Sequence, residues 1–83
     1  MANRVAVIAI IAEDIQASGE INLLLHEYSN FIIGRMGLPY RERNMNIITI
    51  AIDAPQDIIN ALSGKLGRIA GVTAKAVSSK EQS

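Results

Sequence analysis

The stretch that decides the fold is the apolar run VAVIAIIA at residues 5–12. Valine and isoleucine dominate it, and their branched side chains favour extended backbone. The run is too short for a core helix and far shorter than the ~20 apolar residues that span a membrane, so we predict a buried strand. Both of its faces are apolar, one with Val5, Val7, Ala9 and Ile11 and the other with Ala6, Ile8, Ile10 and Ala12.

The same run does not fit an export signal. It ends in Glu13 and Asp14, no A-x-A cleavage site follows, and cleavage would remove the best strand of the chain. We therefore expect a cytoplasmic protein without a membrane segment.

Outward from this strand, the apolar pattern alternates between helical and extended spacing. Residues 14–29 have apolar side chains at helical intervals, and residues 31–40 form a strand that Pro39 restricts to an edge or a bulge. After a polar turn at residues 41–44, residues 45–53 alternate as a third strand, which suits an antiparallel hairpin.

The C-terminal half repeats the order of helix and strand. Asp53 stands three residues before Gln56, a capping-box pattern that begins a second helix with an apolar stripe from Ile58 to Ile69. Gly71 suits the stop of this helix, residues 72–78 alternate as a fourth strand, and residues 79–83 are expected to be a frayed tail.

The order strand-helix-strand, strand-helix-strand predicts a single α+β domain over residues 1–83. It is the ferredoxin-like βαββαβ sandwich, an antiparallel sheet in the order 4-1-3-2 with both helices on one face. The central strands should be the first and third, which are the most apolar. The predicted edge strands contain Pro39 and Lys75.

A sheet with helices on one face should show polar residues at every second position, and this one does not. We predict that Ile8, Ile10 and Ile47 form an apolar face through which the chain assembles as a homo-oligomer, a dimer or a tetramer. The alternative is that strand ends and the C-terminal tail cover this face.

The composition excludes several kinds of chemistry. Among 83 residues the formal net charge is zero and 4% are aromatic, which argues against direct binding of nucleic acid. Without cysteine there is no disulfide, thiolate metal site or cysteine nucleophile. His26 is the only histidine, and we expect it to be a surface residue of the first helix. The alternative is that oligomerisation brings copies of His26 together across a symmetry axis to bind a metal. We assign no catalytic residue, metal site or cofactor and expect no enzyme.

One cluster stands out around the predicted hairpin. Arginine guanidinium groups recognise carboxylates and phosphates, and glycine lets a ligand approach the backbone. These residues are candidates for binding a small anion or a partner protein, although a solvated turn that guards an edge strand is the more ordinary interpretation. The candidates are Arg35, Gly37, Arg41, Arg43 and Asn44.

Three motifs resemble a known family. They are Arg35-x-Gly37-x-Pro39-x-Arg41-Glu42, Asn44-Met45-x-Ile47-Ile48, and ALSGKLGRIAGV at residues 61–72. These motifs, within a similarity over about residues 4–77, resemble the small regulators associated with the iron-only hydrogenase system. That family is ferredoxin-like and related to ACT domains and to the C-terminal domain of the nickel-responsive regulator.

The resemblance implies an oligomeric regulatory module that binds a small ligand or a partner protein, with a ligand-free structural or assembly accessory as the alternative. The nickel-responsive relatives bind metal through several histidines and a cysteine, so nickel sensing does not transfer to this chain. They also have a DNA-binding segment before the first strand, so we expect any effect on transcription to need a partner. The glycine that ACT domains place after this strand is replaced by Ala12-Glu13-Asp14-Ile15, which argues against amino-acid binding there.

Overall fold

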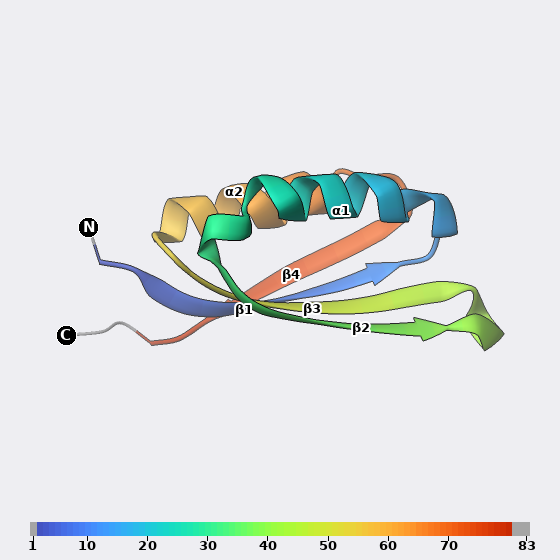
Figure 1. Ribbon diagram of the computed structural model, residues 1–83, viewed down its shortest axis with the longest axis horizontal. Helices are drawn as coiled ribbons and strands as arrows, with labels where there is room; N and C mark the ends of the chain where they lie inside the picture. The colour runs from blue at the N-terminus through green and yellow to red at the C-terminus, as the bar shows by residue number, and fades with distance from the viewer. Residues whose placement is uncertain (1, 81–83) are drawn as a thin grey trace.

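A computed structural model of the chain describes residues 2–80, and over this range it forms an antiparallel sheet of four strands and two α-helices (Figure 1). The sheet order is β2-β3-β1-β4, which is the predicted order read from the opposite edge and is consistent with a ferredoxin-like α+β fold. The elements are β1 (Arg4–Ala12), α1 (Ser18–Glu27), β2 (Ile32–Tyr40), β3 (Met45–Ala54), α2 (Gln56–Gly67) and β4 (Val72–Ser78).

Three short 3₁₀ turns lie between these elements, and two of them shorten the first predicted helix. The helix predicted over residues 14–29 is a turn at η1 (Ile15–Ala17), then α1, then a turn at η2 (Ser29–Phe31). Asp14 caps η1, because its Oδ1 accepts from the Gln16 N–H at 3.0 Å. The hairpin between β2 and β3 turns through η3 (Arg41–Arg43).

The capping box predicted at Asp53 is wrong. Asp53 lies within β3, opposite Val5, and the residue that precedes α2 is Pro55, whose ring offers no capping acceptor. Gln56 instead donates from Nε2 to Asn60 Oδ1 one turn further along α2. By contrast, the edge position that Pro39 favours is confirmed, because β2 is an outer strand of the sheet. A register shift between Ile32 and Gly34 lies at the other end of this strand from Pro39.

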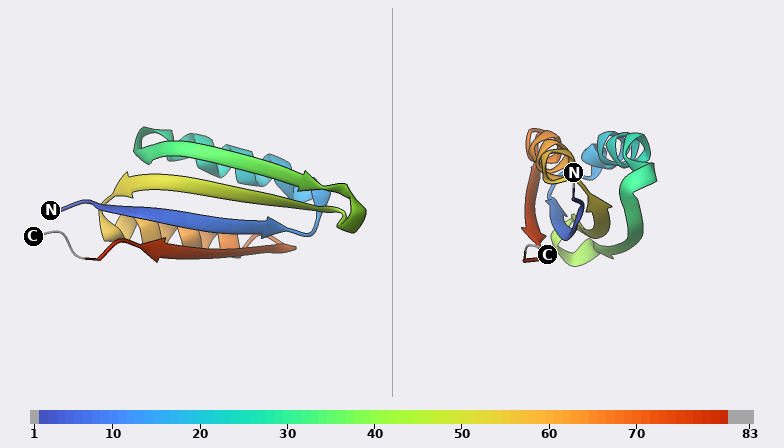
Figure 2. Two further views of the ribbon diagram at one scale, coloured as in Figure 1. Left: turned by 90° about the horizontal axis from the view of Figure 1, so that it is seen from below. Right: turned by 90° about the vertical axis from the view of Figure 1, so that its left-hand side faces the viewer.

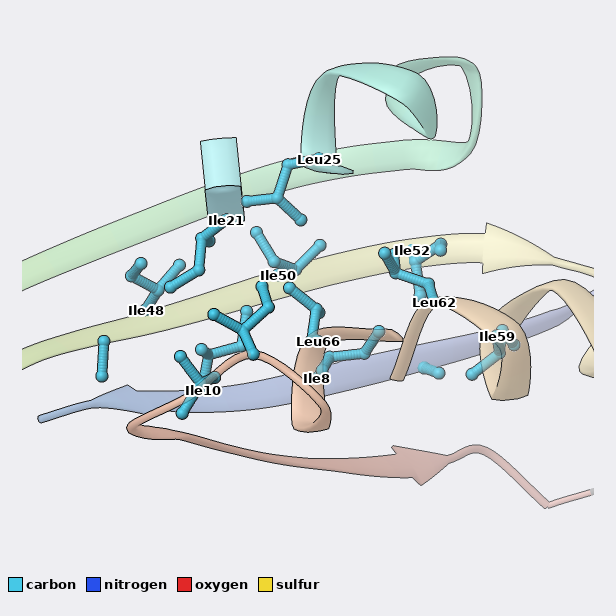
Figure 3. Close-up of a cluster of buried hydrophobic side chains, with 14 of the residues drawn as sticks. Ile8, Ile10, Ile21, Leu25, Ile48, Ile50, Ile52, Ile59, Leu62 and Leu66 are labelled. Carbon is cyan, nitrogen blue, oxygen red and sulfur yellow. The ribbon is translucent and has the colours of Figure 1, made fainter. Parts of the chain in front are cut away.

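Both helices pack on the same face of the sheet, and within residues 2–80 no further layer covers the other face (Figure 2). The hydrophobic core lies between these two layers, and Figure 3 shows its isoleucine and leucine side chains gathered there. Its fully buried large side chains are Ile8, Ile10, Ile21, Ile50, Ile52, Ile59, Leu62 and Leu66.

The burial of β1 corrects the prediction for its two faces. Ile8 and Ile10 are 0% exposed beneath the helices and therefore cannot form a surface for a second subunit. The uncovered side of β1 instead shows Val5, Val7 and Ile11. The alternation of side chains was right, but a strand that is apolar on both faces gives no signal for which face meets the helices.

Beyond β4, the backbone of Ser79 still pairs with the first strand, because its N–H donates to the Val5 carbonyl at 2.8 Å. The predicted frayed tail spans residues 79–83, of which residues 81–83 lie outside the described part. No helix among residues 2–80 is long and apolar enough to cross a membrane.

Candidate functional site

Strand β2 shows an inverted distribution of polar and apolar residues. Residues paired across an antiparallel ladder point to the same face of the sheet. Arg35 and Gly37 pair with the buried residues Ile50 and Ile48, so they point to the side of the helices. The intervening apolar residues point to the uncovered side. Between Arg35 and Leu38 the strand therefore directs its polar and smallest residues toward the helix layer and its large apolar ones away from it. Ile32, which pairs with the buried Ile52, is the large apolar residue of β2 that packs against the core.

This inversion leaves a groove between α1 and β2, because β2 supplies few large side chains to fill the space beneath the helix. The groove consists of two adjoining hollows, of about 340 and 270 Å³, which share Asn22 and Arg35. Arg35 donates from Nη2 to Asn22 Oδ1, a hydrogen bond that crosses the groove between strand and helix. The first hollow is completed by Leu25, His26, Ser29 and Ile32, and the second by Ser18, Gly37, Leu38, Pro39, Asn46 and Ile48.

The second hollow is bounded by a hydrogen bond between its walls and by a glycine in its floor. Asn46 donates from Nδ2 to Ser18 Oγ at 3.1 Å, which ties β3 to the start of α1. At Gly37, nothing lies within 4 Å of the position that a Cβ would occupy, so the space above this residue is open. The groove thus has amide and hydroxyl groups on its walls and aliphatic side chains such as Ile48 at its base.

The predicted ligand residues separate into two places. Arg35 and Gly37 line the groove, whereas Arg41 and Asn44 line a third hollow of about 200 Å³ at the hairpin tip, which meets the groove at Pro39 and Asn46. Arg43 lines none of these three hollows. Asn44 has a left-handed backbone with φ of 52° and donates its N–H to the Arg41 carbonyl at 3.1 Å, so its structural role is to turn the hairpin.

The helix side of the groove was missed at the sequence level, although a signal for it exists. Ser18, Asn22 and His26 recur at intervals of four residues and therefore follow one another along a single face of α1. His26, expected as a simple surface residue, belongs to this stripe and lines the first hollow. Within residues 2–80, no group of three or more His, Cys, Asp or Glu residues could hold a metal ion.

The second feature is the uncovered side of the sheet, which we call the bare sheet face. Side-chain alternation and the strand registers place Val7, Ala9, Ile47, Thr49 and Ala51 in its central strands. Of the residues predicted for an interface, Ile47 therefore lies on this face, unlike Ile8 and Ile10. Its large apolar side chains, each between 39 and 67% exposed, are Val5, Val7, Ile11, Met36, Leu38, Tyr40 and Val77.

The bare sheet face carries few charges. Among the described residues of its four strands, the charged side chains on this side are those of Asp53, opposite Val5, and Lys75, on the edge strand β4. They have opposite signs, so the face as a whole is neutral. An apolar area of this kind marks an interaction surface in most proteins.

The fold and these two features define a small α+β domain, consistent with a ferredoxin-like fold, with a polar groove on its helix side and an apolar sheet face opposite. Residues 4–76 match the family described as "TM1266-like: Iron-only hydrogenase system regulator, putative", and the chain belongs to this family. That description gives the family a regulatory role, as the sequence motifs had implied.

A solved structure supports the same assignment. The chain is similar to the uncharacterized protein TM1266 from Thermotoga maritima, with 44% sequence identity and a TM-score of 0.90. The similarity covers 94% of this chain and 99% of the Thermotoga chain. Among curated proteins, no match to this sequence is found.

Proposed function

We propose that this protein is a non-enzymatic regulatory module of the iron-only hydrogenase system that works as a homo-oligomer, at least a dimer, and binds a small ligand. The observation that carries the proposal is the exposed apolar surface of the bare sheet face, to which we assign a second copy of the chain as occupant. The regulatory role follows the family description, and the ferredoxin-like sheet is consistent with the ACT-like kinship that the motifs imply.

The size of the bare sheet face suits a subunit interface. With strands about 4.8 Å apart and a rise of about 3.3 Å per residue, a sheet of four strands presents a footprint of roughly 500 Å². Two such faces bury at least about 1,000 Å², which reaches the roughly 1,000 Å² that a biological interface is expected to bury. Val7 and Ala9 lie near its centre, where water is excluded most completely and apolar contacts contribute most.

The charge distribution also favours self-association. The chain has no net charge, so two copies approach without long-range repulsion. On the bare sheet face, the negative charge of Asp53 and the positive charge of Lys75 cancel. A two-fold axis packs this face of one copy against the same face of the other, so the two contacting surfaces are both neutral. A face of this composition is complementary to itself.

Light scattering on a matched pair of variants tests the proposed interface. Val7→Lys places a charge at the centre of the bare sheet face, on a side chain that already reaches solvent in one chain. Leu23→Lys makes the same kind of change on α1, where Leu23 is 64% exposed and lies away from the sheet. We expect the unmodified protein and Leu23→Lys to scatter as oligomers and Val7→Lys to scatter as a monomer.

A monomeric unmodified protein would overturn the proposal, and so would an oligomer that both substitutions leave intact. Circular dichroism shows that each variant is folded, so that loss of the oligomer is not confused with unfolding.

A different measurement distinguishes the proposed ligand-binding regulator from the alternative, a ligand-free structural or assembly accessory. A ligand that binds the native state raises the melting temperature, whereas an accessory without a ligand shows no such rise across a metabolite panel.

A further inference from the structure

We infer that the groove between α1 and β2 is an anion site, which takes a small carboxylate- or phosphate-bearing molecule on Arg35. This inference rests on the proposed function, since it names the class of the ligand. The groove faces the helix side of the sheet, so it stays accessible when two copies pack through their bare sheet faces.

The charge in the groove favours a negatively charged ligand. Arg35 comes from the middle of β2, and His26 lines the same hollow from α1. Over the described residues, the side chains that line the two hollows include no aspartate or glutamate. A cationic ligand would therefore meet Arg35 without a counter-charge, whereas an anion gains a charge-assisted hydrogen bond.

The hydrogen-bonding groups fit an anion as well. A guanidinium has five N–H donors, and the bond to Asn22 Oδ1 uses one nitrogen of Arg35 and orients the planar group across the groove. The remaining donors suit two oxygens of one carboxylate or phosphate. Ser18 and Asn46, already bonded to each other, add a hydroxyl and an amide on the neighbouring wall.

The volume limits the ligand to a small molecule. Hollows of about 340 and 270 Å³ lie just above and just below the roughly 300 Å³ at which the range for small-molecule pockets begins. Leu25, Ile32 and Ile48 give the groove an aliphatic base. A short carbon chain that ends in an anionic group fits this arrangement, with the anion at Arg35 and the chain along the base.

Isothermal titration with succinate, citrate and inorganic phosphate tests the site and distinguishes a carboxylate from a phosphate ligand. Arg35→Gln removes the charge and keeps a hydrogen-bonding side chain, and we expect it to weaken binding about tenfold to a hundredfold. Gly37→Val keeps every charge but fills the open space above the strand, and it should weaken binding too. Arg68→Gln, which removes an arginine from the end of α2, is the control and should bind as the unmodified protein does.

Amide chemical shifts locate the ligand independently of the variants. We expect the ligand to move the resonances of Ser18, Asn22 and His26 and to leave those of the hairpin tip in place. No binding by any of the three probes would overturn the inference, as would binding that Arg68→Gln weakens as much as Arg35→Gln. Light scattering on the same samples keeps the two proposals apart, since an oligomer without anion binding refutes the site and leaves the subunit interface standing.

Discussion

Gly71→Ala tests how the turn between α2 and β4 is built. Gly71 has a φ of +78°, a left-handed conformation that costs an alanine about 1 kcal/mol. A Cβ there would lie 2.9 Å from Asp14 Cβ and 3.4 Å from the Asp14 backbone nitrogen. The contact cannot be relieved by moving the loop away, because the Gly71 carbonyl accepts from the Glu13 N–H at 2.8 Å. We expect a total destabilisation of about 2 kcal/mol.

Denaturant unfolding at a fixed protein concentration measures this change, because self-association would otherwise contribute to the apparent stability. A loss of about 2 kcal/mol corresponds to a fall of roughly 10 °C in melting temperature for a domain of this size. Gly64→Ala is the matched control. Gly64 lies inside α2 with only an ordinary contact to Arg68, so the same substitution there should stabilise by about 0.5–1 kcal/mol. A neutral or stabilising Gly71→Ala would refute the structure of this turn.

Three further predictions concern the core, a surface pair and the link between the two proposed sites. Ile8→Ala should lower the free energy of unfolding by about 3–4 kcal/mol, because Ile8 is fully buried. Val7→Ala should lower the free energy of unfolding of the monomer by about 1 kcal/mol or less. Equal losses in the two variants would contradict the assignment of the two faces of β1. Tyr28 Oη accepts a hydrogen bond from Lys65 Nζ at 3.0 Å, and this bond raises the pKa of Lys65 above its ordinary value of 10.5. The pair therefore stabilises the fold fully below pH 10.5, and this contribution is lost as the pH rises through the higher pKa of the folded state. An NMR titration of Lys65 should show its pKa fall in Tyr28→Phe, and an unchanged value would refute the role of this hydrogen bond. Because β2 contributes to both the groove and the bare sheet face, anion binding should change the dissociation constant of the oligomer. Sedimentation with and without phosphate measures this constant, and equal values would show that the groove and the interface are uncoupled.

The order of elements and the sheet topology could be predicted from the sequence because apolar periodicity changes clearly between helix and strand. The uninterrupted apolar run VAVIAIIA agrees with a central strand, and the position of Pro39 agrees with an edge strand. What could not be predicted was the orientation of β1. Its two faces are equally apolar, so the helices could cover either one, and only the register with β3 and the connection to α1 decide between them.

The candidate site was predicted in part. Arg35 and Gly37 line the groove. Arg43 was grouped with them because it is close in sequence, but it lies in the η3 turn of the hairpin and does not line the groove. Asn22 and Asn46 were missed because each is distant in sequence from Arg35 and polar residues are common on surfaces. The contact between α1 and β2 that brings Asn22 to Arg35 joins residues thirteen positions apart, and it depends on how the helix crosses the sheet.

The most direct measurement of the central claim, that the bare sheet face is a subunit interface, uses the absence of cysteine from this sequence. Ala9→Cys introduces a single thiol at the centre of the face, exposed in one chain, and Ala61→Cys introduces one on the exposed side of α2. We expect the labelling of residue 9 by a small thiol reagent to slow about tenfold or more as rising protein concentration drives association, while residue 61 keeps its rate. Equal and concentration-independent rates at the two positions would contradict the claim.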